Sequence, residues 1–328
     1  MRTILSLLFV LAMVAIPGGI AIAQPSPQPP RVGVLVSGAL VESPISDDRD
    51  RYAAFLSGLR ELGYVQGRNI IVEPRERKGR PDLFPVLVAE LVRLKVAAIV
   101  VSGATAIEPA VKATKTIPIV MIAADDPVGR EFVASLSLPG GNVTGLSGPI
   151  EGMRGKQMEI LKDAIPWATR VAVLDSHDRK GFLEEFQRAA KALRVELTSV
   201  DVNRSEQFEG AFAKITAMRP DALITLRQSL TIGRRKQIAN FALREKLPSM
   251  FERRDFVQAG GLLSYGFNDR AAWRRAAAFV DKILKGANPA NLPVEAPPFE
   301  LVINLATAKK LGITIVPELL LEADEVIK

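Results

Sequence analysis

The chain has 328 residues, of which 48% are hydrophobic and 24% charged, with no cysteine and a formal net charge of +7. Length and composition favour a globular protein of two domains, and the absence of cysteine excludes disulfides, a thiol nucleophile and a thiolate metal site. Because the basic residues are mixed with acids and form neither a zinc finger nor a basic arm, we do not expect nucleic-acid binding.

The N-terminus has the three regions of a signal peptide. Arg2 precedes an apolar run at residues 4–16, and small residues end the segment at Ala23. We therefore predict cleavage after Ala23, which makes residues 1–23 a signal peptide. The alternative is an uncleaved membrane anchor, although the apolar run is shorter than the ~20 residues that a span needs. Residues 24–30 contain four prolines and are expected to form an extended linker.

Beyond the linker, short apolar runs alternate with amphipathic stretches. Strands are expected where β-branched residues cluster, and helices where apolar residues recur every three or four positions. In the first half the expected strands are residues 32–36, 69–73, 97–101 and 117–122, and the expected helices are 50–62, 83–94 and 106–114. This alternation predicts a parallel sheet covered on both faces, with loops gathered at the carboxyl ends of the strands.

The first strand has a close copy later in the chain. Residues 31–37 read RVGVLVS, and residues 170–176 read RVAVLDS. The elements that follow the copy repeat the earlier order, with strands expected at 171–174, 196–200, 222–226 and 247–251 and helices at 182–193 and 208–218. We therefore predict an α/β protein of two similar Rossmann-like lobes with parallel sheets.

The remaining segments predict how the lobes are joined. Glycine-rich runs at 139–145 and 259–266 occupy matching places in the two halves. They are followed by an expected helix at 155–161 and one at 271–284, a proline-rich segment at 289–298, a strand at 299–304 and a helix at 306–311. Lobe 1 is predicted to comprise residues 31–145 plus 267–290, and lobe 2 residues 146–266 plus 291–328. More than one crossing between lobes makes a hinge, as in proteins that close like a clamshell on a ligand.

Ordered motifs over essentially the whole mature chain carry a family likeness. They are GLRELGYV at 58–65, GRN at 67–69, TIPIV at 116–120, DPV at 126–128, PGGNVTG at 139–145, FVQAGGLLSYG at 256–266, VDKILKGA at 280–287 and the segment 299–312. In these motifs the chain resembles the solute-binding proteins of ABC importers with a type I periplasmic-binding fold. The group it resembles includes receptors for tryptophan and other aromatic amino acids.

The resemblance implies a receptor in the periplasm that captures a small ligand between its lobes and delivers it to an ABC permease in the inner membrane. The ligand it implies is an amino acid or another small carboxylate, aromatic ones included. It also implies a monomer that uses no cofactor and does no covalent chemistry. A clamshell sensory receptor that reports a ligand to a membrane partner is the alternative.

Loops at the carboxyl ends of the strands in the first lobe supply candidate ligand contacts. Ser37 is a hydrogen-bond donor for a ligand oxygen. Ser102 and Thr105 stand at a helix N-terminus, where they either assist carboxylate binding or cap the helix. Asp126 matches the family's Asp-Pro-Val motif and either meets a ligand amine or caps a turn. Thr144 is either a ligand contact or a hinge residue.

The second lobe supplies Ser176, Arg227, Phe251 and Tyr265 at equivalent places. The guanidinium of Arg227 is predicted to bind a ligand carboxylate bidentately, and the alternative is a salt bridge to Asp125 or Asp126 across the lobes. Phe251 and Tyr265 either stack on an aromatic or apolar ligand or pack in the core at the strand ends.

Signatures of enzymes and metal proteins are missing from the sequence. His177 is the only histidine and lies in a polar run typical of a solvated loop. No Gly-x-Gly-x-x-Gly follows the first strand, no phosphate loop ends in Gly-Lys-Ser/Thr, and no cluster has metal-ligand spacing. We therefore expect no catalytic residue, no metal and no cofactor.

Overall fold

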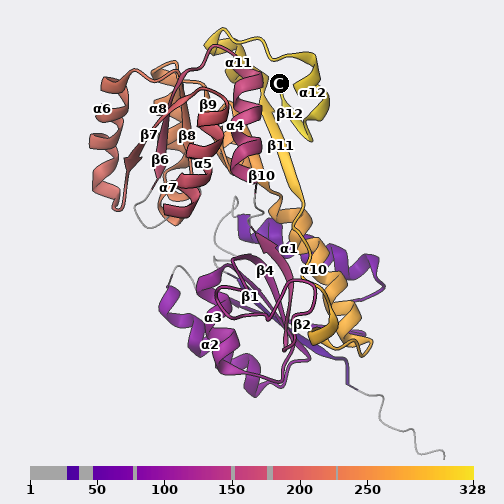
Figure 1. The fold of residues 1–328 in the computed structure, drawn as a ribbon. Helices are drawn as coiled ribbons and strands as arrows, with labels where there is room; N and C mark the ends of the chain where they lie inside the picture. The colour runs from indigo at the N-terminus through magenta and orange to yellow at the C-terminus, as the bar shows by residue number, and fades with distance from the viewer. Residues whose placement is uncertain (1–27, 37–46, 77–79, 149–151, 176–179, 227) are drawn as a thin grey trace, which may run out of the picture.

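Two α/β lobes lie one above the other, and the chain crosses between them three times (Figure 1). The computed structural model describes residues 28–36, 47–76, 80–148, 152–175, 180–226 and 228–328. Within these residues, lobe 1 holds a five-stranded sheet and lobe 2 a seven-stranded sheet. The two-lobed α/β fold predicted from the sequence is confirmed.

Lobe 1 is a parallel sheet with helices on both faces. The strand order is β2-β1-β3-β4-β5. The strands are β1 (Arg31–Val36), β2 (Ile71–Glu76), β3 (Ala98–Ser102), β4 (Ile119–Asp125) and β5 (Val143–Gly148). Helices α1 (Asp47–Glu61) and α10 (Asp269–Leu284) cover one face, and α2 (Phe84–Arg93) and α3 (Ala104–Ala113) cover the other. A 3-10 helix, Pro81–Leu83, precedes α2.

Alternation along the strands explains these two layers, because successive side chains point to opposite faces of a sheet. In β1, Val34 packs in the same cluster as Phe55 of α1, whereas Leu35 packs in the cluster of Leu91 from α2. Gly33 lets α2 lie close to the strand, since a Cβ atom there would lie 2.7 Å from Cδ1 of Leu91. The apolar run of β1 is therefore buried on both sides, as parallel strands usually are.

Lobe 2 has a sheet of the same kind, with two further strands at one edge. Its strand order is β12-β11-β10-β9-β8-β6-β7. The strands are β6 (Arg170–Asp175), β7 (Glu196–Asp201), β8 (Ala222–Thr225), β9 (Ser249–Phe251), β10 (Leu263–Phe267), β11 (Phe299–Asn304) and β12 (Glu325–Ile327). The helices are α4 (Met153–Ala164), α5 (Lys180–Ala192), α6 (Phe208–Met218), α7 (Ser229–Gly233), α8 (Arg235–Arg244), α9 (Arg254–Gln258), α11 (Leu305–Leu311) and α12 (Pro317–Glu322), with 3-10 helices at Ser205–Gln207 and, in the segment between α10 and β11, at Pro289–Asn291.

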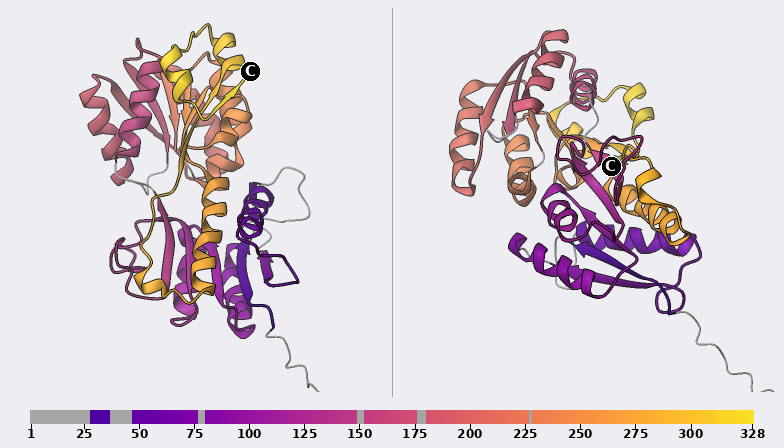
Figure 2. Two further views of the ribbon diagram at one scale, coloured as in Figure 1. Left: turned by 90° about the vertical axis from the view of Figure 1, so that its right-hand side faces the viewer. Right: turned by 60° about the horizontal axis from the view of Figure 1, so that its bottom comes forward.

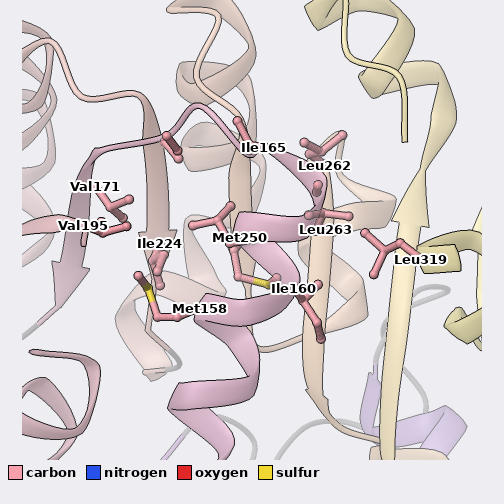
Figure 3. Packing of buried hydrophobic residues seen from close by; sticks show 14 of the residues in the cluster. Met158, Ile160, Ile165, Val171, Val195, Ile224, Met250, Leu262, Leu263 and Leu319 are labelled. Atoms are coloured by element: carbon pink, nitrogen blue, oxygen red, sulfur yellow. The ribbon is translucent and has the colours of Figure 1, made fainter. Parts of the chain in front are cut away.

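The core of lobe 2 forms where α4 lies against the sheet. Met158 and Ile160 of α4 belong to one buried cluster with Ile224 of β8, Met250 of β9 and Leu263 of β10 (Figure 3). At about 25 cal/mol per Å² of apolar surface removed from water, such clusters supply most of the free energy that opposes chain entropy. The core thus fixes α4, the first helix after the chain enters lobe 2, firmly on the sheet.

The two lobes repeat one topology, as the sequence predicts. The order β7-β6-β8-β9-β10 in lobe 2 matches β2-β1-β3-β4-β5 in lobe 1, and β1 and β6 are the strands with the shared sequence. One pairing departs from the expected wholly parallel sheets, because β11 runs antiparallel to β10. Strand β10 runs toward the hinge, whereas β11 comes from the hinge and runs away from it, so the two neighbouring strands run in opposite directions.

The described segments that flank the three crossings lie close together, since Leu146 of β5 forms a bridge with Glu295 and β10 pairs with β11 (Figure 2). The first follows β5, which stays in the sheet of lobe 1 as far as Gly148, past the expected boundary at 145. The second joins β10 to α10, and the third leads into β11. Glu295 forms a bridge with Leu146 in lobe 1, so the chain leaves lobe 1 after this residue rather than at the expected 290.

A buried ion pair anchors the chain where it enters lobe 2. Arg154 of α4 lies 2.6 Å from Glu252, which follows β9, and the side chains are only 2% and 7% exposed. Arg154 also donates to Gln157, whose amide donates to the carbonyl of Tyr265 at 2.6 Å. These contacts connect α4, the end of β9 and the last residues of β10 just before the second crossing.

Replacing Arg154 by alanine is expected to lower the free energy of unfolding by about 3–5 kcal/mol, because it leaves the carboxylate of Glu252 buried without its counter-charge. Urea unfolding of the variant and of the wild type measures the loss. Arg170→Ala is the control, since its pair with Asp221 is half exposed and is expected to contribute about 0–1 kcal/mol. Equal losses in the two variants would contradict this interpretation.

Candidate functional site

The carboxyl ends of the parallel strands in both lobes face the opposite lobe. Strand β5 ends at the first crossing and β10 at the second, and the neighbouring parallel strands run in the same direction. Loops that follow these strands therefore lie between the lobes. In open α/β sheets this is the edge at which ligands bind.

In lobe 1, two predicted hydroxyls lie together at the start of α3. Ser102 ends β3 half-buried, and Thr105 is exposed in the first turn of the helix. Gly103 is the N-cap residue, with a φ of 80°, and no side chain caps the helix. Neither hydroxyl therefore takes the capping role that the sequence left open, and the helix begins with N–H groups that suit an anion.

Two other predicted residues of lobe 1 make local contacts. Asp126 is exposed, and its Oδ1 accepts a hydrogen bond from the backbone N–H of Gly129 at 2.9 Å, which is the turn-capping alternative. Thr144 is fully buried, and its hydroxyl donates to the carbonyl of Leu292 at 2.7 Å, so it ties β5 to the segment that leads to the third crossing. A ligand contact of either residue stays a prediction.

In lobe 2, the two predicted aromatic residues pack against other aromatic rings. Phe251 is fully buried and stacks on Phe256 with ring centroids 4.7 Å apart. Tyr265 is half-buried and stacks on Phe299 at 5.7 Å. These contacts correspond to the core-packing alternative, and stacking on a ligand stays a prediction.

Several predictions fall on parts of the chain that the structure does not describe. Ser37, Ser176, His177 and Arg227 lie outside the described residues, and so does the side chain of Asp125.

A pocket beside the hinge gathers charged residues that the sequence did not single out. It encloses about 70 Å³ and is bounded by both lobes. Its lining residues are Arg51, Arg253, Arg254, Gln258, Phe267, Asp269, Arg270 and Glu300. Four guanidinium groups thus meet two carboxylates at the place where the lobes join.

Ion pairs within this pocket connect the lobes. Arg253, which follows β9 in lobe 2, donates from Nη1 to Oδ2 of Asp269 at 2.6 Å. Asp269 is the first residue of α10 in lobe 1, and the same oxygen accepts from Nη2 of Arg51 in α1 at 2.9 Å. All three side chains are at most 15% exposed, so water screens these pairs less than it screens surface pairs.

Glu300, at the start of β11, has a strongly altered acidity. Burial raises the pKa of its carboxyl to about 7, and the Arg254 guanidinium opposes this shift only in part. The carboxylates of Asp269, Glu325 and Asp324 raise the pKa further. Oε2 accepts from Nη1 of Arg254 at 3.3 Å and from Nδ2 of Asn268 at 3.0 Å. The carboxyl therefore bridges the second and third crossings and changes charge near neutral pH.

One sequence signal could have pointed to this pocket. The charged run at residues 252–255 directly follows the strand expected at 247–251, in the loop position that faces the other lobe. No local pattern in the sequence pairs Arg253 with Asp269, because the two residues belong to different lobes.

The described part of the chain holds neither a candidate metal cluster nor a helix that could cross a membrane. Among its residues, no group of three or more His, Cys, Asp or Glu side chains is arranged to hold a metal ion. None of its helices combines the length and the apolar character that crossing a bilayer requires.

Comparison with known proteins identifies the family. The family model described as ABC transporter substrate binding protein matches residues 36–327, nearly the whole described chain. The chain belongs to this family. In this substrate-binding protein of an ABC transporter, the charged pocket and the uncapped start of α3 both lie between the two lobes.

Named relatives of this substrate-binding protein are distant in sequence and close in fold. A tyrosine-binding protein of Clostridioides difficile (strain R20291) is 25% identical over 276 residues, which cover 83% of this chain and 79% of the relative. The crystal structure of an ABC domain in complex with L-Trp from Streptococcus pneumonia superposes with a TM-score of 0.78 at 25% identity, covering 91% of this chain and 100% of that one. A conserved domain protein from Vibrio cholerae superposes with a TM-score of 0.77 at 26% identity, covering 90% and 99%.

Glu300→Gln is expected to stabilise this substrate-binding protein at pH 8 and to have a smaller effect at pH 5. The folded pKa, about 7, lies above the ordinary value of 4.5. Between these two values the unfolded chain has already lost the proton that the folded chain keeps, so wild-type stability falls as pH rises. The variant escapes this loss, and the difference between pH 8 and pH 5 is expected to be roughly 2–3 kcal/mol.

Urea unfolding of both proteins at a series of pH values from 5 to 8 measures this difference. Glu325→Gln is the matched control, because Glu325 pairs with the same Arg254 but its side chain is 38% exposed. We expect a smaller pH dependence from the control. A Glu300→Gln effect that is independent of pH would show that the buried carboxyl does not titrate in this range.

Proposed function

We propose that this protein is the ligand-capturing component of an ABC importer. In this proposal it binds an amino acid or another small carboxylate between its lobes and delivers it to a permease in the membrane. Family membership supports a binding role, and the meeting of the strand ends between two hinged lobes supports the place of binding. A protein of this kind binds and releases its ligand without catalysing a reaction.

The ligand class rests on the relatives and on one local feature. One relative is named a tyrosine-binding protein, and a solved relative was crystallised with L-Trp. In this chain the uncapped start of α3, with the hydroxyls of Ser102 and Thr105, offers hydrogen-bond donors to an α-carboxylate. We propose that Asp126 meets the α-amino group and that Arg227 adds a second contact to the carboxylate. The observation that carries the proposal is the uncapped helix start at the inter-lobe edge.

Capture would work by closure of the two lobes. A ligand that contacts both lobes binds the closed form more tightly and so shifts the equilibrium toward it. The permease would then meet a surface to which both lobes contribute. We further propose that residues 1–23 export the chain to the periplasm, with cleavage after Ala23, and that the mature protein acts as a monomer.

A thermal-shift screen of the mature protein against the amino acids, aromatic acids and small carboxylates tests the ligand class. We expect L-tyrosine, L-tryptophan or a chemically similar compound to raise the melting temperature. At a ligand concentration of 100 times Kd, binding adds about 2.7 kcal/mol to the free energy of unfolding. A panel without any stabilising compound, together with the absence of a co-purified ligand, would count against the proposal.

Substitutions at the start of α3 test the placement of the carboxylate. Ser102→Ala and Thr105→Val are each expected to weaken binding of the ligand found by the screen by roughly tenfold, because each removes a hydrogen bond to a charged group. Thr116→Val is the control, since Thr116 is exposed and lies before the amino end of β4, away from the other lobe. Titration calorimetry measures the affinities. In the same titrations, unchanged affinity in Arg227→Ala would remove Arg227 from the site.

A further inference from the structure

Asp269 accepts hydrogen bonds from two arginines that belong to different lobes. Arg51 reaches it from α1 within lobe 1, and Arg253 reaches it from lobe 2, both at Oδ2. The pocket that surrounds these groups lies beside the crossings and contains none of the residues that we propose as ligand contacts. The three-residue ion bridge is therefore separate from the proposed ligand site.

The lobe 2 end of the bridge is held in place by its own lobe. Nε and Nη2 of Arg253 donate to Oδ1 and Oδ2 of Asp255 at 3.0 and 3.3 Å, which is the two-point geometry of a guanidinium and a carboxylate. Arg253 is only 5% exposed. This arrangement fixes the guanidinium and directs its remaining amino group, Nη1, toward lobe 1.

The lobe 1 end is equally well fixed. Asp269 begins α10, and Asn268 caps this helix by accepting the N–H of Ala271 at 2.9 Å. Helix α10 packs along α1, where Gly58 is so close that a Cβ atom would lie 2.6 Å from the carbonyl oxygen of Arg274. The carboxylate of Asp269 therefore moves with lobe 1 as one body.

A rotation of one lobe against the other changes the distance between Arg253 and Asp269 unless its axis passes through their contact. Hydrogen bonds weaken within a few tenths of an ångström, and both partners are largely shielded from water. When the contact opens, Arg253 keeps Asp255 and Asp269 keeps Arg51, so neither charge is left buried without a partner. The contact is thus strong enough to favour one orientation and can still be broken.

We propose that the Arg253–Asp269 contact sets the equilibrium between relative orientations of the lobes, and thereby the ligand affinity, without either residue touching the ligand. The affinity part rests on the proposed function. The orientation part concerns the ligand-free protein and stands independently. Arg253 and Asp269 are positioning residues in this scheme, because they act through the lobes that carry the ligand contacts.

Distances between spin labels on the two lobes test the orientation part. The chain has no cysteine, so Ala113→Cys in α3 and Ala217→Cys in α6, both exposed helix positions, give one label on each lobe. In the ligand-free protein, Asp269→Ala is expected to widen the distribution of label distances or shift its mean. Arg253→Met is a second variant that breaks the same contact from the other side. Circular dichroism confirms that each variant is folded.

Two controls separate the bridge from general effects of charge and packing. Arg51→Met removes a cation from the same oxygen but leaves the contact between the lobes, and Arg274→Met breaks the pair of α10 with Glu61 within lobe 1. Arg274→Met is expected to keep the wild-type distribution. Arg51→Met is expected to narrow it or to shift its mean in the opposite direction from Asp269→Ala, because the pair that Asp269 keeps when the contact opens is then missing. If Asp269→Ala kept the wild-type distribution, or if Arg274→Met changed it as Asp269→Ala does, the proposal would be wrong.

The affinity part is measured with the compound that most stabilises the wild type in the thermal screen. We expect Asp269→Ala to change its Kd by roughly fivefold or more, a usual size for coupling between sites, and Arg274→Met to leave it unchanged. Unchanged affinity in Asp269→Ala, combined with an altered distance distribution, would refute the link to binding while leaving the bridge intact. A screen without any ligand would refute the proposed function, and the label distances would still decide on the bridge.

Discussion

In both sheets the strand beside the hinge runs toward the other lobe, and this direction governs where the remaining parts of the molecule lie. Because β5 and β10 end at the crossings, the parallel strands next to them end between the lobes as well. The first turns of α1, α3 and α10 consequently lie at the same edge as the loop after β9. Backbone N–H groups, arginines and carboxylates gather there as a result of topology, before any particular side chain is considered.

Much of this fold could be predicted from the sequence, because most strands are continuous apolar runs with helices between them. No strand was expected at β5 or β10, because each contains glycine. A Cβ atom at Gly145 would lie 2.1 Å from the carbonyl oxygen of Met121, and one at Gly266 would lie 2.0 Å from that of Glu252. Glycine at these positions allows close approach of neighbouring backbone, whereas in a sequence it indicates a turn. Helices α7 and α8 were not expected from the sequence either, because polar residues dominate the segment between β8 and β9.

The candidate site was less predictable than the fold. Ser102 and Thr105 could be assigned to the inter-lobe edge from the sequence, because they follow a strand and the assignment needs only the direction of that strand. Phe251 shows the limit, because both faces of the β9 region are covered: Met250 packs in one buried cluster and Phe251 in the other. The contact of Arg253 with Asp269 depends on the relative orientation of the lobes, which no local pattern in the chain encodes.

The chemistry of the hinge region is compatible with the proposed closure of the lobes. A large apolar interface between the lobes would hold one orientation, because separation would expose its whole area to water. Here the contacts that Asp269 makes with Arg51 and Arg253 are ion pairs, and the nearby carboxyl of Glu300 has a pKa of about 7. Such contacts are directional, so they distinguish one orientation from another, yet their groups are readily solvated when they separate. The carboxylate of Asp269 is shared between Arg51 and Arg253, so in the proposed change of lobe orientation Arg51 would still neutralise it once Arg253 had separated.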